Sequence, residues 1–173
     1  MNAGPARAPS FHLELPIGPE WKSIDRLHST IARGAGAVPL DEQLCQTLAM
    51  VASELVENAV KYGDWSRAKM AALAVSPRAT PAGDVIDIEV TNPIRSEAEH
   101  EAVQATLAWI SGFASPREAY IARIRELAEE VEPEQNRLGL VRVAYEGGCQ
   151  LEATLLPGRM LCVRATLLYV VAS

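Results

Sequence analysis

The segment that most constrains the fold of this chain is a long helical pattern between Asp41 and Gly63. Asp41 suits the N-cap of a helix, and Gly63 suits the position just after its last turn. The apolar residues between them recur at helical spacing and share one face: Leu44, Leu48, Val51, Ala52, Leu55, Val56, Ala59 and Val60. We therefore predict an amphipathic helix that buries this face against another layer of the protein.

Strand-like runs flank this helix on both sides. Residues 11–17 alternate apolar and polar side chains, and Pro16 favours a place at the edge or end of a strand. Residues 67–77 and 84–93 form two such runs, and the turn-rich segment SPRATPAG separates them. The segment from Cys149 onward has the same pattern around Pro157-Gly158. Two β-hairpins are the natural prediction.

Helical patterns fill most of the remaining chain. The first spans about 20–36 and ends at Gly34 and Gly36. Helical spacing relates five residues within it: Trp21, Ile24, Leu27, His28 and Ile31. Two more lie between 96 and 133, the first ending near Gly112 and the second starting with Ser115 as N-cap and Pro116 in its first turn. A short helix then ends at Gly147 and Gly148.

Strand pairs and helix groups are thus segregated along the chain, which indicates an α+β fold. We predict a two-layer α/β sandwich in which helices cover one face of a mixed, mostly antiparallel sheet. The length of 173 residues suits one domain, which we place at 11–173, after a small, Pro-rich tail at 1–10.

The charge balance limits the classes of partner. A formal net charge of −6 argues against non-specific binding of nucleic acid or of anionic membranes, which requires a basic surface. No apolar run approaches the ~20 residues of a membrane helix, and the first residues lack a signal-peptide pattern. Cys45, Cys149 and Cys162 have neither CxxC spacing nor a histidine cluster, so we expect free thiols and a cytoplasmic protein without structural zinc.

Glu54 and Asn58 stand four residues apart, which stacks them on one face of the predicted helix. Such a pair is usually an ordinary solvent-facing one. A second interpretation is a phosphate-transfer site: Asn58 offers a neutral oxygen to Mg²⁺, Glu54 polarises a water or hydroxyl, and Lys61 offsets phosphate charge.

The segment SELVENAVKYG, residues 53–63, resembles the N-box (E-x-x-x-N-A-x-K/H-Y/G-G) of the GHKL, or histidine-kinase-like, ATPase superfamily. The match is nearest to anti-sigma-factor serine kinases. The resemblance implies the Bergerat fold, with Mg²⁺ and ATP as cofactors. It also implies that Glu54 is the catalytic base, Asn58 the Mg²⁺ ligand, and Lys61 and Tyr62 neighbours of the phosphates.

The later motifs of the superfamily are altered in this chain. Where the family has D-x-G-x-G, the chain has EVTNPI, so Asn92 stands in place of the adenine-binding Asp and both glycines are missing. Of G-x-G-L-G-L only NRLGL remains, in which the resemblance assigns Arg137 and Gly139 to the phosphates. Thr166 matches a threonine near adenine, although a threonine is also an ordinary strand residue.

The segment of about 95–135 corresponds to the lid of the family. Its second helix carries an apolar stripe of Ile121, Ile124, Leu127 and Val131. Three interpretations stay open for this stripe: packing on the domain, docking of a partner helix, or a homodimer contact with a second copy. The combination of altered glycine loops and an intact N-box also resembles that of SiaB-type kinases of bacterial partner-switching pathways. The VTNP and NRLGL…AYE stretches carry this resemblance.

Three hypotheses for function follow. The first is a Mg²⁺- and ATP-dependent Ser/Thr kinase acting on a small regulatory protein, of the phospho-acceptor or anti-sigma antagonist type. The second is a degenerate GHKL-fold binding module that sequesters a protein partner without ATP turnover. The third, the detached catalytic domain of a histidine kinase, is disfavoured because no dimerisation helix with a phospho-acceptor His is recognisable.

Overall fold

The structure is a computed structural model of the chain and describes residues 12–19, 27, 29–31, 33, 41–68, 70–129 and 138–169. The elements follow in the predicted order. They are β1 (Leu13–Ile17), α2 (Glu42–Tyr62), β2 (Ala71–Thr80), β3 (Gly83–Pro93), α3 (Glu97–Ser111), α4 (Pro116–Glu129), α5 (Gly139–Tyr145), β4 (Cys149–Leu156) and β5 (Met160–Tyr169). In the predicted first helix, Leu27 and Ile31 are helical and buried, whereas Trp21, Ile24 and His28 lie outside the described residues.

The five strands form one sheet in the order β1-β2-β3-β5-β4, and every neighbouring pair is antiparallel. The two predicted hairpins are present as β2–β3 and β4–β5, and β5 joins them by pairing with β3. Pro16 lies in the edge strand β1, where a residue without a backbone N–H is tolerated. The predicted two-layer α/β sandwich is confirmed, with a sheet that is antiparallel throughout its described strands.

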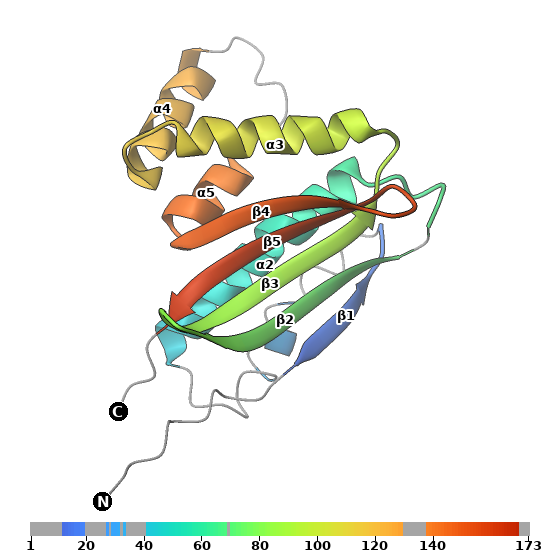
Figure 1. Cartoon of the computed structure of the whole chain (residues 1–173), viewed down its shortest axis with the longest axis horizontal. Coiled ribbons are helices and arrows are strands. Elements are labelled where there is room, and N and C mark those ends of the chain that lie inside the picture. The colour runs from blue at the N-terminus through green and yellow to red at the C-terminus, as the bar shows by residue number, and fades with distance from the viewer. Residues whose placement is uncertain are drawn as a thin grey trace, which may run out of the picture.

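Helix α2 lies across one face of the sheet, which we call the inner face (Figure 1). Asp41 caps the helix as predicted, because its carboxylate accepts a hydrogen bond from the Leu44 N–H at 2.7 Å. The helix ends at Gly63, where the backbone becomes extended (φ −64°, ψ 147°), and a Cβ at this position would stand 2.5 Å from the carbonyl oxygen of Ala59. The apolar stripe of α2 packs on Ile86, Ile88 and Val90 of β3, and on further side chains of the inner face.

The opposite, outer face of the sheet carries charged side chains that pair with one another. Arg78 forms an ion pair with Asp87, which also accepts a hydrogen bond from Thr166 at 2.7 Å. Arg164 lies between Glu89 and Glu152 on the neighbouring strands. This separation of apolar and charged side chains follows from strand pleating, which sends successive side chains to opposite faces.

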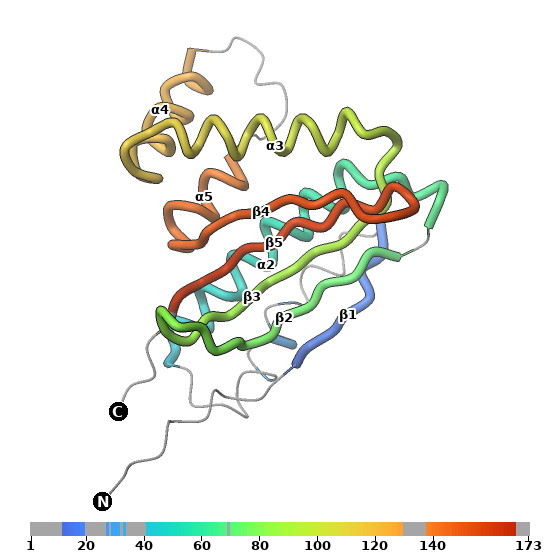
Figure 2. Tube along the Cα trace, in the orientation of Figure 1, coloured from blue at the N-terminus to red at the C-terminus, as the bar shows by residue number. Residues whose placement is uncertain are grey.

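Helices α3 and α4 occupy the segment that the resemblance assigns to a lid. Figure 2 shows α3 running along β4, and the side-chain amide of Gln104 donates to the Ala153 carbonyl at 2.6 Å. Ser115 and Pro116 start α4 as predicted, and the Ser115 hydroxyl accepts from the Glu118 N–H. The guanidinium of Arg123 lies 4.1 Å from the ring centre of Trp109, which joins α4 to α3. Together these contacts place α3 along β4 and α4 against α3.

The stripe predicted on α4 is partly open to solvent. Ile121 is 38% exposed and Ile124 is 44% exposed, Leu127 is half-buried, and Val131 lies outside the described residues.

None of the helices in the described part of the chain has both the length and the apolar character that a bilayer span requires.

Candidate functional site

A cavity of about 430 Å³ opens between α2, the inner face of the sheet, α3 and α5. Its volume lies in the range of small-molecule sites, about 300–1,000 Å³. Most of its wall is apolar: Leu55 and Ala59 from α2, Val90, Ile94, Leu161 and Val163 from the sheet region, Ala102 and Val103 from α3, and Leu140 from α5. An apolar slot of this size suits a flat ring system.

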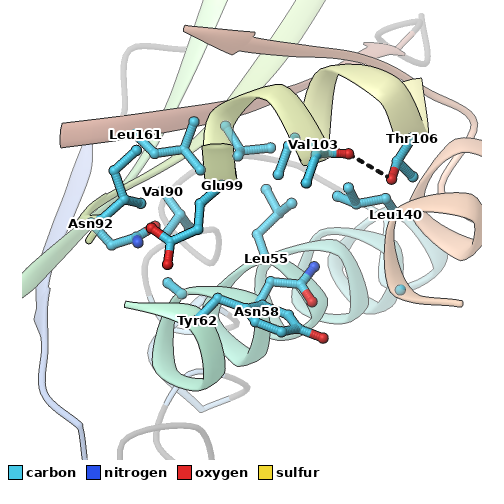
Figure 3. Close-up of a pocket in the computed structure, with 15 residues that line it drawn as sticks. Leu55, Asn58, Tyr62, Val90, Asn92, Glu99, Val103, Thr106, Leu140 and Leu161 are labelled. Atoms are coloured by element: carbon cyan, nitrogen blue, oxygen red, sulfur yellow. Dashed lines mark hydrogen bonds between the residues drawn. The ribbon is translucent and has the colours of Figure 1, made fainter. Parts of the chain in front are cut away.

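A few polar groups project into this apolar cavity. Figure 3 shows Asn92 and Glu99 towards one end, and Asn58 and Tyr62 along the α2 wall. Thr106 also lines the cavity, but its hydroxyl donates to the Ala102 carbonyl at 3.0 Å within α3. The combination of an apolar slot with a few directed amides and a carboxylate is typical of a ligand site.

Asn92, which the resemblance assigns to adenine, lines the cavity at its sheet wall. It is only 4% exposed, and its amide nitrogen donates to the carbonyl of Pro93 at 3.1 Å. The missing glycines have a structural consequence here, because β3 continues through Pro93, which pairs with Met160 of β5. A rigid strand end therefore holds Asn92, rather than a glycine loop.

Glu99 was not anticipated from the sequence as a site residue. One carboxylate oxygen accepts hydrogen bonds from the N–H groups of Arg95 at 2.6 Å and Ser96 at 3.2 Å, which caps the start of α3. The S-x-x-E pattern of residues 96–99 predicts this capping role. Its place in the cavity wall depends on how α3 crosses the sheet, which no local pattern specifies.

Asn58 lines the cavity, whereas Glu54, one turn earlier on α2, does not. The carboxylate of Glu54 instead accepts a hydrogen bond from Nη1 of Arg142 on α5 at 2.7 Å. Its second oxygen would lie 3.0 Å from a Cβ built on Gly139, and the Asn58 amide would lie 3.4 Å from it. The glycine at the start of α5 thus allows this helix to rest directly on the polar pair of α2.

Arg142 connects Glu54 to helix α4 through Glu146. Its Nε donates to Glu146 at 2.7 Å, and Glu146 accepts from the Tyr120 hydroxyl of α4 at 3.2 Å. Burial raises the pKa of Glu54, and the charge and hydrogen bond of Arg142 oppose that rise without cancelling it. The hydrogen bond to Glu146 raises the pKa of Arg142 further, so this guanidinium stays charged.

The other predicted site residues divide into three groups. Tyr62 lines the cavity, while Lys61 is exposed, with its Nζ 5.4 Å from the centre of the Tyr62 ring. Thr166 faces the outer side of the sheet, where it binds Asp87, because it stands an odd number of residues from the cavity-lining Val163. Arg137 lies outside the described residues.

The groups that line the cavity fit the base of a nucleotide better than they fit its phosphates. The apolar slot and the Asn92 amide offer a stacking surface and a hydrogen-bonding group. At the other end Asn58 is a neutral oxygen ligand of the kind that Mg²⁺ accepts when phosphates supply the remaining ligands. The described residues contain no cluster of three or more His, Cys, Asp or Glu side chains that could hold a metal ion. A cation here would therefore depend on oxygens from its ligand.

Comparisons with known proteins support the fold. No family model matches the chain, and no curated protein matches it. Among solved structures, a chain from the SiaB–SiaC complex of Pseudomonas aeruginosa superposes with a TM-score of 0.64. The two chains are 16% identical over 90% of this chain and 88% of that one. The chain shares its fold with this member of the SiaB–SiaC complex. At this level of identity the similarity establishes the fold alone.

Proposed function

We propose that this chain is an ATP-binding regulatory protein that acts as a Ser/Thr kinase on a small protein partner in a bacterial partner-switching pathway. The observation that carries the proposal is the cavity under α3, into which Asn58 and Asn92 project from two different elements. The N-box resemblance assigns Asn58 to Mg²⁺, and Asn92 stands where the altered D-x-G-x-G motif has its adenine-binding Asp. The fold shared with a chain of the SiaB–SiaC complex supports a protein partner.

The base end of the site would accept the adenine ring. Leu55, Val90 and Val163 provide apolar surfaces for its faces, and the buried amide of Asn92 provides a donor and an acceptor for its edge. A neutral amide is a weaker acceptor than the carboxylate of the family motif, so we expect modest affinity.

The phosphate end would lie towards Asn58, which would complete the coordination of a phosphate-bound Mg²⁺. Glu54 would act as the base: it accepts the proton of a partner hydroxyl while that oxygen bonds to the γ-phosphorus, and ADP leaves with the bonding electrons. The raised pKa of Glu54, caused by burial, makes this carboxylate a stronger base than an exposed one.

A titration of the melting temperature with millimolar Mg·ATP tests the binding step, because a ligand that binds only the folded state stabilises it. We expect a rise for the wild type and for Glu54→Ala, and a smaller Mg²⁺-dependent rise for Asn58→Ala. Glu54→Ala should bind ATP but lose phosphoryl transfer. Absence of any shift in the wild type would reject the proposal.

A second candidate function is partner sequestration without ATP turnover, and the Glu54–Arg142 ion pair favours it. In the observed conformation the proposed base is engaged by a guanidinium and lies outside the cavity wall. The two candidates differ in one result: a sequestering module forms its protein complex with or without ATP and leaves the partner unphosphorylated.

A further inference from the structure

Two arginines of this chain are each held between two carboxylates in closely similar surroundings. Arg164 bridges Glu89 and Glu152 on the outer face and is 42% exposed. Arg142 bridges Glu54 and Glu146 and is 41% exposed. The difference lies in what they connect, because Arg164 joins three strands of one sheet, whereas Arg142 joins α2 to α5 and, through Glu146 and Tyr120, to α4.

Glu54 is confined on several sides in this arrangement. Nη1 of Arg142 holds one carboxylate oxygen at 2.7 Å, and the backbone of Gly139 stands close to the other. The side chain is 15% exposed and does not contribute to the cavity wall. A hydroxyl that entered through the cavity would meet Asn58 before it met Glu54.

We propose that Arg142 is a latch that holds Glu54 in a resting state, and that the site becomes competent when the Arg142 side chain rotates into solvent. The inference rests on the proposed function, since it assigns a regulator to the same base. Arg142 is then a positioning residue that acts through Glu54 and has no contact of its own with the reacting atoms.

The packing of α5 indicates which part moves. Val141 and Val143 flank Arg142 in sequence and are fully buried, so the body of α5 is anchored in the two cores. The Arg142 side chain is 41% exposed, so water can replace its carboxylate partners, while Glu54 stays half-buried at 15% exposed. Release is therefore a side-chain rotation, with α5 left in place.

Release of Arg142 would also change the chemistry of Glu54. Arg142 supplies the charge and the hydrogen bond that lower the pKa of this carboxyl, while burial, Glu57 and Glu146 raise it. Without the guanidinium the pKa rises further, which brings the base closer to the working pH and makes it more effective. The tyrosine on α4 bonds to Glu146, so contacts on the lid have a physical route to the latch.

The test compares Arg142→Gln with the matched control Arg164→Gln, which loses an equivalent double ion pair on the sheet face opposite the cavity. Both proteins receive saturating Mg·ATP without a protein partner, so that water takes the γ-phosphate in place of the partner hydroxyl and gives its proton to Glu54. The melting temperature and the ADP released by this transfer to water are both measured. We expect ATP to stabilise both variants. ADP release should rise about fivefold in Arg142→Gln alone, because the loss of a weak ion pair changes the ratio of released to latched protein by about that factor. Arg142→Lys, which keeps the charge, should stay near the wild-type rate.

The outcomes separate the latch from the proposed function. An ATP-induced stabilisation in every variant with equal or lower ADP release in Arg142→Gln would overturn the latch and leave nucleotide binding standing. No stabilisation in any variant would reject both. If Arg142→Gln fails to fold, Glu146→Gln weakens the same latch from its other side and should raise ADP release by a smaller factor, whereas an unchanged rate would contradict the latch.

Discussion

The two faces of the sheet use polar side chains in opposite ways. On the outer face Arg78, Asp87 and Thr166 satisfy one another directly. On the inner face Asn58 and Asn92 project from separate elements into a cavity. The described residues show no hydrogen bond between the two, and the Asn92 amide donates to the Pro93 carbonyl. Because desolvated polar groups require partners, self-satisfied charges indicate a structural role, whereas amides grouped around a hollow indicate a ligand.

The largest predicted effect is a difference in stability between substitutions at two adjacent residues of β3, one on each face of the sheet. Ile88 is fully buried on the inner face, and Glu89 pairs with Arg164 on the outer one. We expect Ile88→Ala to lower the free energy of unfolding by about 2–5 kcal/mol. Glu89→Ala should cost about 1 kcal/mol or less, because its ion pair is partly exposed. Urea unfolding of both variants measures the difference, and equal losses would contradict the assignment of the faces.

The next effect concerns the cavity itself. Ala102 lines it from α3, whereas Ala105, three residues further and likewise exposed, does not line it. Ala102→Trp should fill the slot and weaken Mg·ATP binding by about tenfold or more, about 1.4 kcal/mol. Ala105→Trp is the control and should bind like the wild type in calorimetric titrations. Equal affinities in the two variants would place the nucleotide elsewhere.

The smallest predicted effect is a pH dependence on the outer face. Burial alone would raise the pKa of Asp87, but hydrogen bonds from Arg78 and Thr166 outweigh it and lower the pKa below its usual 3.8. A lowered pKa in the folded state contributes stability at neutral pH that is lost as the pH falls below about 4. Asp87→Asn removes this contribution, so its deficit relative to the wild type should shrink between pH 7 and pH 3.

Urea midpoints across that pH range measure the Asp87 effect. Glu101→Gln, which removes an exposed carboxyl on α3, serves as the control and should follow the wild type. A deficit of Asp87→Asn that stays constant with pH would show that the lost packing, and not the charge, determines its stability.

Much of the fold could be predicted from the sequence because local signals agree with the final structure. The cap at Asp41, the apolar stripe of α2 and the turn at Pro157-Gly158 each act over a few residues and were found where predicted. The extent of the sheet follows from the same alternation of side chains. Its uniformly antiparallel order depends on how β5 pairs with β3, which lie far apart in the chain.

The site was harder to predict because its geometry depends on long-range contacts. Asn58 and Tyr62 line the cavity as members of a local motif on one helix. The partner of Glu54 is 88 residues away, and although Arg142 and Glu146 have recognisable helical spacing, nothing local indicates the third member. The side of the sheet that Thr166 faces depends on strand register, which a composition of β-favouring residues leaves open.

The most direct measurement is an NMR titration with Mg²⁺ and a non-hydrolysable ATP analogue that follows both faces at once. The side-chain amide signals of Asn58 and Asn92 report on the inner face, and the Nε–H signals of Arg78 and Arg164 report on the outer face. If the cavity binds nucleotide, the two amide signals shift together while the two arginine signals stay in place. Amide signals that remain unmoved at millimolar analogue, or shifts confined to the arginines, would contradict nucleotide binding between α2 and the sheet.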